Sequence, residues 1–175
     1  MPRTTALFVL LLLLSACATV PDALRGDFPS GLTPSLVQLQ PQGHIGQAVR
    51  WGGVILGLQN HHDRSTLEIL AYPLDDSSRP IPDQASQGRF LVEMKQFLDP
   101  ASFETRREVS VVGTIQGLQT RKIGEYEYQY PVLEGRAVHL WAKRQALIPD
   151  YDDPWSPWYP YPWYAPYPYP YPYHR

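Results

Sequence analysis

The sequence predicts an all-β fold, a small antiparallel barrel of about five to six strands followed by a disordered C-terminal tail. Several short segments between residues 46 and 148 alternate apolar and polar side chains, which is the period of a half-buried strand. No segment keeps a clean helical period over ten or more residues. The last 26 residues hold eight of the 19 prolines, and proline cannot join the interior of a sheet.

Length and composition exclude several classes of protein. The 175 residues, 43% hydrophobic and 18% charged, are enough for one folded domain. A net charge of -2 provides no basic field to attract nucleic acid. Cys17 is the single cysteine, so the sequence excludes an internal disulfide and any CxxC metal or redox site.

The N-terminal residues have the features of a secretory signal. Arg3 precedes an unbroken apolar run of nine residues from Ala6 to Leu14. A helix of that length spans about 14 Å, whereas the hydrocarbon core of a bilayer is about 30 Å thick. The run is therefore predicted to be the apolar region of a signal peptide and not a transmembrane helix.

The apolar run ends in Leu14-Ser15-Ala16-Cys17, which resembles the lipobox of bacterial lipoprotein precursors. In those precursors the cysteine thiol receives diacylglycerol, the preceding peptide bond is cut, and the new amino group is acylated. The resemblance implies a signal peptide over residues 1–16, a cleavage flank at Leu14, Ser15 and Ala16, and attachment of lipid, palmitate included, to Cys17. The alternative is an ordinary secretory signal that happens to contain a cysteine, although the Ala-x-Ala pattern of such signals is poorly matched.

The residue after the cysteine indicates which membrane is reached. Lipoproteins retained in the inner membrane resemble one another in carrying Asp there, whereas this chain has Ala18. We therefore expect a lipid-anchored protein of the outer membrane that faces the periplasm. Three acyl chains, at about 0.8 kcal/mol per buried CH₂, would make the attachment effectively permanent.

Residues 17–45 are predicted to be the lipidated N-terminus and a tether. Four prolines interrupt this segment and few of its apolar positions are periodic. One short ordered piece is expected around Leu36 to Leu39.

Three strands are predicted in the first half of the β domain. Residues 48–59 are rich in Val, Ile and Leu, and the Gly52-Gly53 pair within them indicates a bulge or tight bend. A polar turn leads into the second strand, 65–74, and a proline-containing loop leads into the third, 87–94.

Three more segments complete the expected barrel. Residues 107–117, 126–133 and 136–142 have the same alternating pattern, with a further bend expected at Gly113. Closure into a barrel would remove exposed sheet edges, and five or six strongly bent strands favour an OB-like barrel over a sandwich.

Several motifs along these strands resemble the Slp family of outer-membrane lipoproteins. They are, in chain order, VRWGGVI at 49–55, YPL at 72–74, GRF at 88–90, FLDP at 97–100, VSVVG at 109–113, YP at 130–131 and LW at 140–141. The resemblance covers roughly Cys17 to Ala146 and does not extend to the tail. It implies a β domain over residues 46–148 and a starvation- or stationary-phase-associated envelope role. It implies no enzymatic activity.

The same motifs have a structural and a functional interpretation. As fold determinants, Trp51 would cap the core or stack beneath the guanidinium of Arg50, and Arg89 would pair with Asp99 or a loop carbonyl. As functional residues, they would line a shared ligand groove, since OB-like barrels often bind oligomers on one face.

Residues 149–175 form a Pro/Tyr/Trp-rich segment that is predicted to be extended. Eight tyrosines and three tryptophans lie between residues 150 and 175, which is half of the 22 aromatic residues in the chain. Alternating Tyr-Pro pairs favour polyproline II and populate cis bonds, so no single conformation is expected. The tail is either a solvated segment without a partner or a contact surface for the membrane, for peptidoglycan or lipopolysaccharide sugars, or for another envelope protein.

Catalytic and metal-binding patterns are weak in this sequence. His61, His62 and Asp63 have suitable side chains, but adjacent residues of a strand face opposite sides, so a solvated turn is predicted. GxSxG, HExxH and phosphate-binding glycine loops are missing from the sequence. We therefore expect no enzyme, no cofactor and no metal.

The leading hypothesis is a lipid-anchored outer-membrane lipoprotein with a non-enzymatic structural or protective role in the envelope. The alternative is an envelope binding module that holds an oligosaccharide, lipid or peptide through the barrel or the aromatic tail. A hydrolase that uses unidentified Asp and His groups is the third hypothesis.

Overall fold

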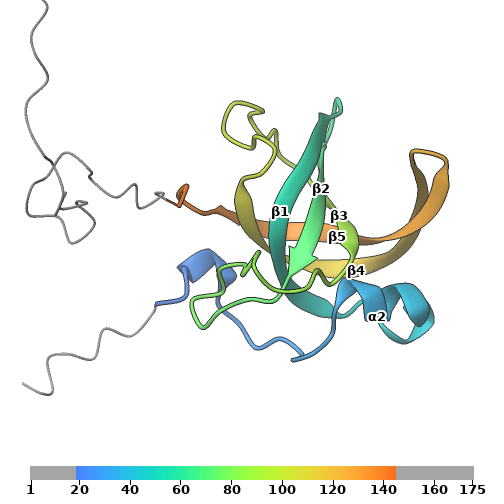
Figure 1. Ribbon diagram of the computed structural model, residues 1–175, viewed down its shortest axis with the longest axis horizontal. Coiled ribbons are helices and arrows are strands. Elements are labelled where there is room, and N and C mark those ends of the chain that lie inside the picture. The colour runs from blue at the N-terminus through green and yellow to red at the C-terminus, as the bar shows by residue number, and fades with distance from the viewer. Residues whose placement is uncertain (1–18, 145–175) are drawn as a thin grey trace, which may run out of the picture. The chain divides into compact units, whose positions relative to one another are not determined.

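The computed structural model describes residues 19–144 and divides the chain into two units at residues 143 and 144, the second of which lies almost wholly beyond the described part. Three short helices precede five strands (Figure 1): η1 Asp22–Leu24, α2 Pro34–Leu39, η2 Pro41–Gly43, β1 Ala48–Asn60, β2 Ser65–Tyr72, β3 Arg89–Met94, β4 Glu108–Ile123 and β5 Tyr126–Leu140. Within residues 19–144 no helix is long and apolar enough to cross a membrane.

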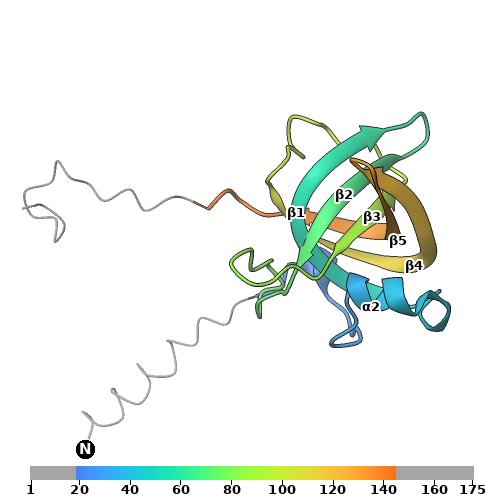
Figure 2. The same cartoon turned by 45° about the vertical axis from the view of Figure 1, so that its right-hand side comes forward.

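The five strands, labelled in Figure 2, close into a barrel in the order β1-β2-β3-β5-β4. The predicted all-β, OB-like barrel is therefore confirmed. It is not purely antiparallel, because β3 and β5 pair in parallel at Leu91–Val132 and its two successors. The parallel pair arises because β4 turns back through a hairpin, which brings β5 alongside β3 in the same direction.

The two final predicted strands are one continuous strand, β5. Its register with β4 shifts at Arg136, since Val112 faces Ala137 while Gly113 faces Gly135. A bulge of this kind bends a strand without ending it. A Cβ on Gly113 would lie 2.7 Å from the carbonyl oxygen of Glu134, so glycine is needed at this bend.

The glycine pair in β1 has a different role from the predicted bulge. Gly52 and Gly53 stay in register with β2, and the register shift comes later, between Ile55 and Gly57. A Cβ on Gly53 would lie only 1.9 Å from the carbonyl oxygen of Leu70. The glycine therefore permits a close approach of the two backbones.

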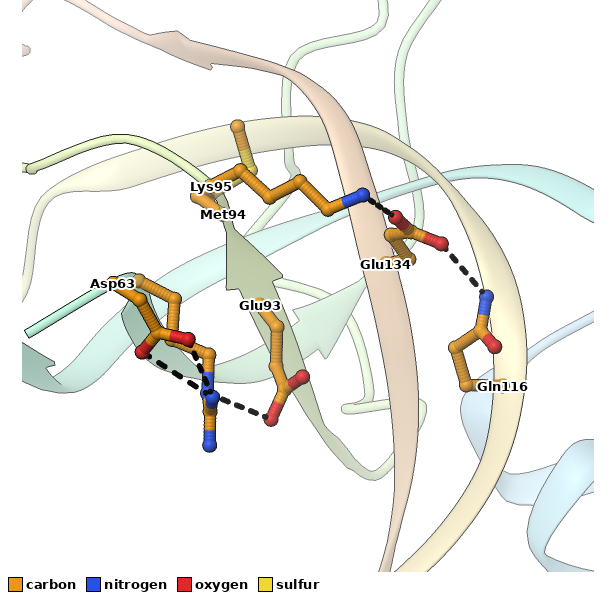
Figure 3. Close-up of a pocket in the computed structure, with 7 residues that line it drawn as sticks. Asp63, Glu93, Met94, Lys95, Gln116 and Glu134 are labelled. Atoms are coloured by element: carbon orange, nitrogen blue, oxygen red, sulfur yellow. Dashed lines mark hydrogen bonds and ion pairs between the residues drawn. The ribbon is translucent and has the colours of Figure 1, made fainter. Parts of the chain in front are cut away.

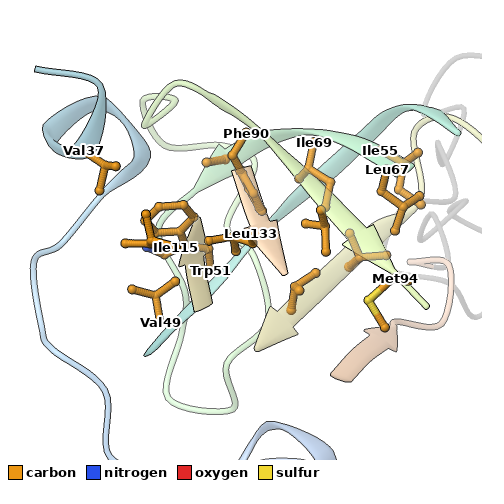
Figure 4. Close-up of a cluster of buried hydrophobic side chains, with 14 of the residues drawn as sticks. Val37, Val49, Trp51, Ile55, Leu67, Ile69, Phe90, Met94, Ile115 and Leu133 are labelled. Carbon is orange, nitrogen blue, oxygen red and sulfur yellow. The ribbon is translucent and has the colours of Figure 1, made fainter. Parts of the chain in front are cut away.

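The core fills the barrel interior with side chains from all five strands and from α2 (Figure 4). On β2, Leu67, Ile69 and Ala71 point inward, as their predicted alternation requires. Trp51 and Phe90 meet edge to face, with 5.2 Å between ring centroids.

The N-terminal segment packs on the barrel, which differs from the predicted tether, whereas the ordered piece expected around Leu36 to Leu39 is confirmed as α2. Leu24 in η1 and Val37 in α2 are fully buried, and Val37 belongs to the main core. Thr33 caps α2 by accepting a hydrogen bond from the Leu36 amide, and Pro34 follows at the first helical position. Residues 22–45 are therefore part of the domain. The sequence did not reveal this because the buried residues of the segment are isolated and follow no strand or helix period.

The end of the barrel opposite α2 is closed by the β1–β2 turn and the β3–β4 loop. The hydroxyl of Ser65 accepts a hydrogen bond from the Leu98 amide at 3.0 Å, and Asn60 donates to the Leu98 carbonyl at 3.0 Å. Leu98 is 3% exposed and packs into the core from this side.

Candidate functional site

The predicted lipid site lies outside the described residues. Leu14, Ser15, Ala16 and Cys17 all precede Thr19, where the described structure begins, and the aromatic tail lies beyond Arg144. The structure does describe the segment that comes shortly after the cysteine. Leu24, seven residues after Cys17, is fully buried and packs with η1 against β4 and β5.

The β1–β2 turn contains the histidines considered for chemistry. His61, His62 and Asp63 are exposed, as predicted for a solvated turn. Asp63 pairs with the adjacent Arg64 at 3.3 Å, and Arg64 also lies 3.7 Å from a carboxylate oxygen of Glu93. Among residues 19–144 no three His, Cys, Asp or Glu side chains converge to hold a metal ion.

A charged groove of about 270 Å³ begins at this turn (Figure 3). Beyond Arg64 and Glu93, Lys95 pairs with Glu134, and Gln116 donates a hydrogen bond to Glu134 at 3.2 Å. Its hydrogen bond to Glu134 raises the pKa of the Lys95 amino group. Each of the two cations in this groove is thus paired: Arg64 is shared by Asp63 and Glu93, and Lys95 pairs with Glu134.

A polar network joins the outer surfaces of β2, β3 and β5. One carboxylate oxygen of Glu68 accepts hydrogen bonds from Arg89 at 2.9 Å and from the Tyr130 hydroxyl at 2.8 Å. The Tyr128 hydroxyl accepts from the Arg89 amide at 3.0 Å. Burial, followed by the hydrogen bond to Glu68, raises the pKa of Tyr130, so its hydroxyl stays protonated and donating.

The predicted pairing of Arg89 with Asp99 is wrong. Glu68 is directly opposite Leu91 on the neighbouring strand, so Arg89 is its diagonal neighbour on the outer face. The sequence alone could have predicted this ion pair, because Glu68 and Arg89 are opposite charges at outward positions of two successive strands.

A second groove, of about 310 Å³, is lined by the 28–33 segment, the start of β1 and the β2–β3 loop. The Arg50 guanidinium lies 5.3 Å from the Phe28 ring centroid and donates to the Leu24 carbonyl at 3.1 Å. Trp51 instead points inward and donates to the Leu32 carbonyl at 2.7 Å. Of the two predicted roles of Trp51, packing in the core is the one observed, and Arg50 stacks on Phe28, which sequence reasoning missed.

Comparison with known proteins links the chain to envelope lipoproteins. A family model described as "Outer membrane lipoprotein Slp family" matches residues 14–173. The match continues through the Pro/Tyr/Trp-rich segment, whereas the predicted resemblance ended near Ala146.

Two relatives from Escherichia coli K12 are similar over most of their length. "Uncharacterized lipoprotein YeaY" is 37% identical over 147 residues, which cover 82% of this chain and 76% of the relative. "Outer membrane protein Slp" is 30% identical over 173 residues, or 95% of this chain and 92% of the relative. A small single-stranded DNA-binding protein from Streptomyces coelicolor has a TM-score of 0.36 at 11% identity, covering 54% of this chain and 94% of that one.

Proposed function

The chain belongs to the Slp family of outer membrane lipoproteins, and from this premise we propose that it has a non-enzymatic structural or protective role in the envelope, anchored through acylated Cys17. The single observation that carries the proposal is the position of Cys17. The one cysteine of the chain ends the Leu-Ser-Ala-Cys motif, and the family match begins at residue 14, within that motif. The domain is proposed to face the periplasm.

The barrel itself supports a structural role. The partly buried Glu68 carboxylate is held by Arg89 and Tyr130, and the groove charges pair with one another. Catalytic groups need proton-transfer capacity at an accessible site, whereas these groups are engaged in holding strands together.

Intact mass and membrane fractionation test the proposal. The full chain and Cys17→Ser are expressed in a Gram-negative host, with Phe97→Ser as a matched variant whose exposed side chain lies at the far end of the barrel. We expect wild type and the Phe97 variant to start at residue 17, carry acyl mass and fractionate with the outer membrane. Cys17→Ser is expected to lose both the acyl mass and the outer-membrane location. An unacylated wild type, or an unaffected Cys17 variant, would overturn the anchor.

A second candidate function is binding of an envelope oligosaccharide, lipid or peptide. The groove beside Phe28 favours it, because about 310 Å³ reaches the lower range of ligand pockets and combines an aromatic ring with Arg50. Native mass spectrometry of the chain extracted from membranes would detect a retained ligand. The ligand should disappear in Phe28→Ala and remain in the matched Tyr126→Ala variant. Equal retention in both variants would place binding elsewhere.

A further inference from the structure

One stretch of the barrel domain carries no formal charge. The 22 residues from Phe28 to Val49 contain no Asp, Glu, Lys or Arg, in a chain that is 18% charged. The stretch includes the 28–33 segment, α2, η2 and the start of β1. It runs along the lower edge of the barrel in Figures 1 and 2.

This uncharged stretch exposes large aliphatic side chains. Leu36 is 48% exposed, Leu39 is 77% exposed and Ile45 is 49% exposed. Leu36 and Leu39 are three residues apart and share one face of α2, while Val37 enters the core and fixes the rotation of the helix. Ile45 follows η2, which packs against α2. We name Leu36, Leu39 and Ile45 the aliphatic patch.

The proposed anchor leaves the barrel little freedom to move away from the membrane. Leu24 is seven positions after Cys17, and an extended chain over seven positions reaches at most about 25 Å. Leu24 is fully buried on the barrel, so the linker between the anchor and the folded domain ends at this residue. The N-terminal segment then leads directly along the barrel to the aliphatic patch, twelve residues after Leu24.

We propose that the aliphatic patch lies in the headgroup region of the lipid leaflet that holds the acyl chains of Cys17. This inference rests on the proposed anchor at Cys17. Aliphatic side chains gain free energy on leaving water, and an uncharged surface has no charge to desolvate at the membrane. Large exposed apolar side chains often mark an interaction surface. The short linker to Cys17 keeps the bilayer within reach of this one.

The opposite end of the barrel has the chemistry of a water-facing surface. The β1–β2 turn and the β3–β4 loop carry seven charged side chains: Asp63, Arg64, Lys95, Asp99, Glu104, Arg106 and Arg107. Burying these charges in lipid would be costly. In the proposed orientation, this end faces water and the aliphatic patch faces the membrane.

The acidic β2–β3 loop sharpens the expected lipid preference. This loop lies at the same end of the strands as α2, and the Gln87 carbonyl accepts a hydrogen bond from Ser35. It carries Asp75, Asp76 and Asp83 against the single cation Arg79. Contact with the aliphatic patch should therefore be stronger on zwitterionic than on anionic vesicles, and added salt should reduce that difference.

The test uses the absence of any second cysteine. Leu39→Cys in the full acylated chain provides one free thiol for an environment-sensitive fluorophore, and Phe97→Cys is the matched control at the far end. Both native side chains are highly exposed, at 77% and 72%, so neither variant should disturb the fold. Each protein is reconstituted in phosphatidylcholine vesicles that contain lipid with a headgroup-level nitroxide quencher.

We expect loss of emission at position 39 and unchanged emission at position 97. Emission at 39 that matches 97, in a chain with confirmed acyl mass, overturns the inference and leaves the proposed anchor intact. Lipid-independent self-quenching at position 39 would show that a second copy covers the patch, which also overturns it. A chain without acyl mass refutes the proposed anchor and this inference together.

Discussion

The two ends of the barrel close the same core with opposite chemistry. At one end, the uncharged stretch from Phe28 to Val49 inserts Val37 into the core and leaves Leu36 and Leu39 exposed. At the other, Leu98 closes the core beneath loops that carry seven charged residues. Burial of an apolar side chain is thus common to both ends, whereas the exposed surface differs. The lesson is that core packing does not determine what an end presents to its surroundings.

The largest expected loss of stability comes from variants that test whether the N-terminal segment belongs to the domain. Leu24→Ala and Leu98→Ala remove equally buried leucines from the N-terminal segment and from the far loop. Each should cost about 2 to 5 kcal/mol in the free energy of unfolding, since a cavity remains in either case. Denaturant unfolding of the two variants beside wild type measures this. A cost below about 0.5 kcal/mol for Leu24→Ala alone would restore the interpretation of a free tether.

A smaller loss of stability is expected from the polar network on the outer surfaces of β2, β3 and β5. Tyr130→Phe removes the hydrogen bond to Glu68 and should cost about 1 to 2 kcal/mol in the free energy of unfolding. Because burial raises the pKa of Tyr130 above its usual 10.0, the fold favours the protonated phenol. That contribution is present below about pH 10 and is lost as the pH rises through the raised pKa of the folded state.

The pH dependence can be isolated by comparing wild type with the variant. The difference in unfolding free energy between wild type and Tyr130→Phe should be smaller at pH 11 than at pH 8, because wild type loses the contribution of the protonated phenol at alkaline pH. Tyr126→Phe, which changes a 70% exposed tyrosine, serves as control and should show no such convergence. A constant difference between wild type and Tyr130→Phe across this range would contradict the assigned role of the hydroxyl.

The smallest expected effect concerns the charged end. Arg64→Met removes the ion pairs with Asp63 and Glu93, whose side chains are 70% and 40% exposed. Solvent screening limits such pairs to about 0.2 to 1 kcal/mol, and the loss should vanish in high salt. Thermal unfolding at low and at high ionic strength measures it. A salt-independent loss would mean that Arg64 stabilises the turn by packing.

Much of the barrel could be predicted because its signals are local. Alternation of apolar residues in 65–72 and 89–94 gives each strand its inward face without knowledge of its neighbours. The parallel pairing of β3 with β5 could not be predicted in this way, since it depends on segments about 40 residues apart. The continuity of β5 through Gly135 was missed for a similar reason, because a bulge is defined by the partner strand.

The sequence by itself determined the all-β class, the position of the single cysteine within its lipobox-like motif, and the exposed turn at His61 to Asp63. Each of these depends on residues that are adjacent or alternate along the chain. Only the tertiary structure decided that Leu24 and Val37 pack on the barrel and that Glu68 holds both Arg89 and Tyr130. The physical reason is that burial and hydrogen bonding of isolated side chains depend on distant partners, which only the closed barrel brings together.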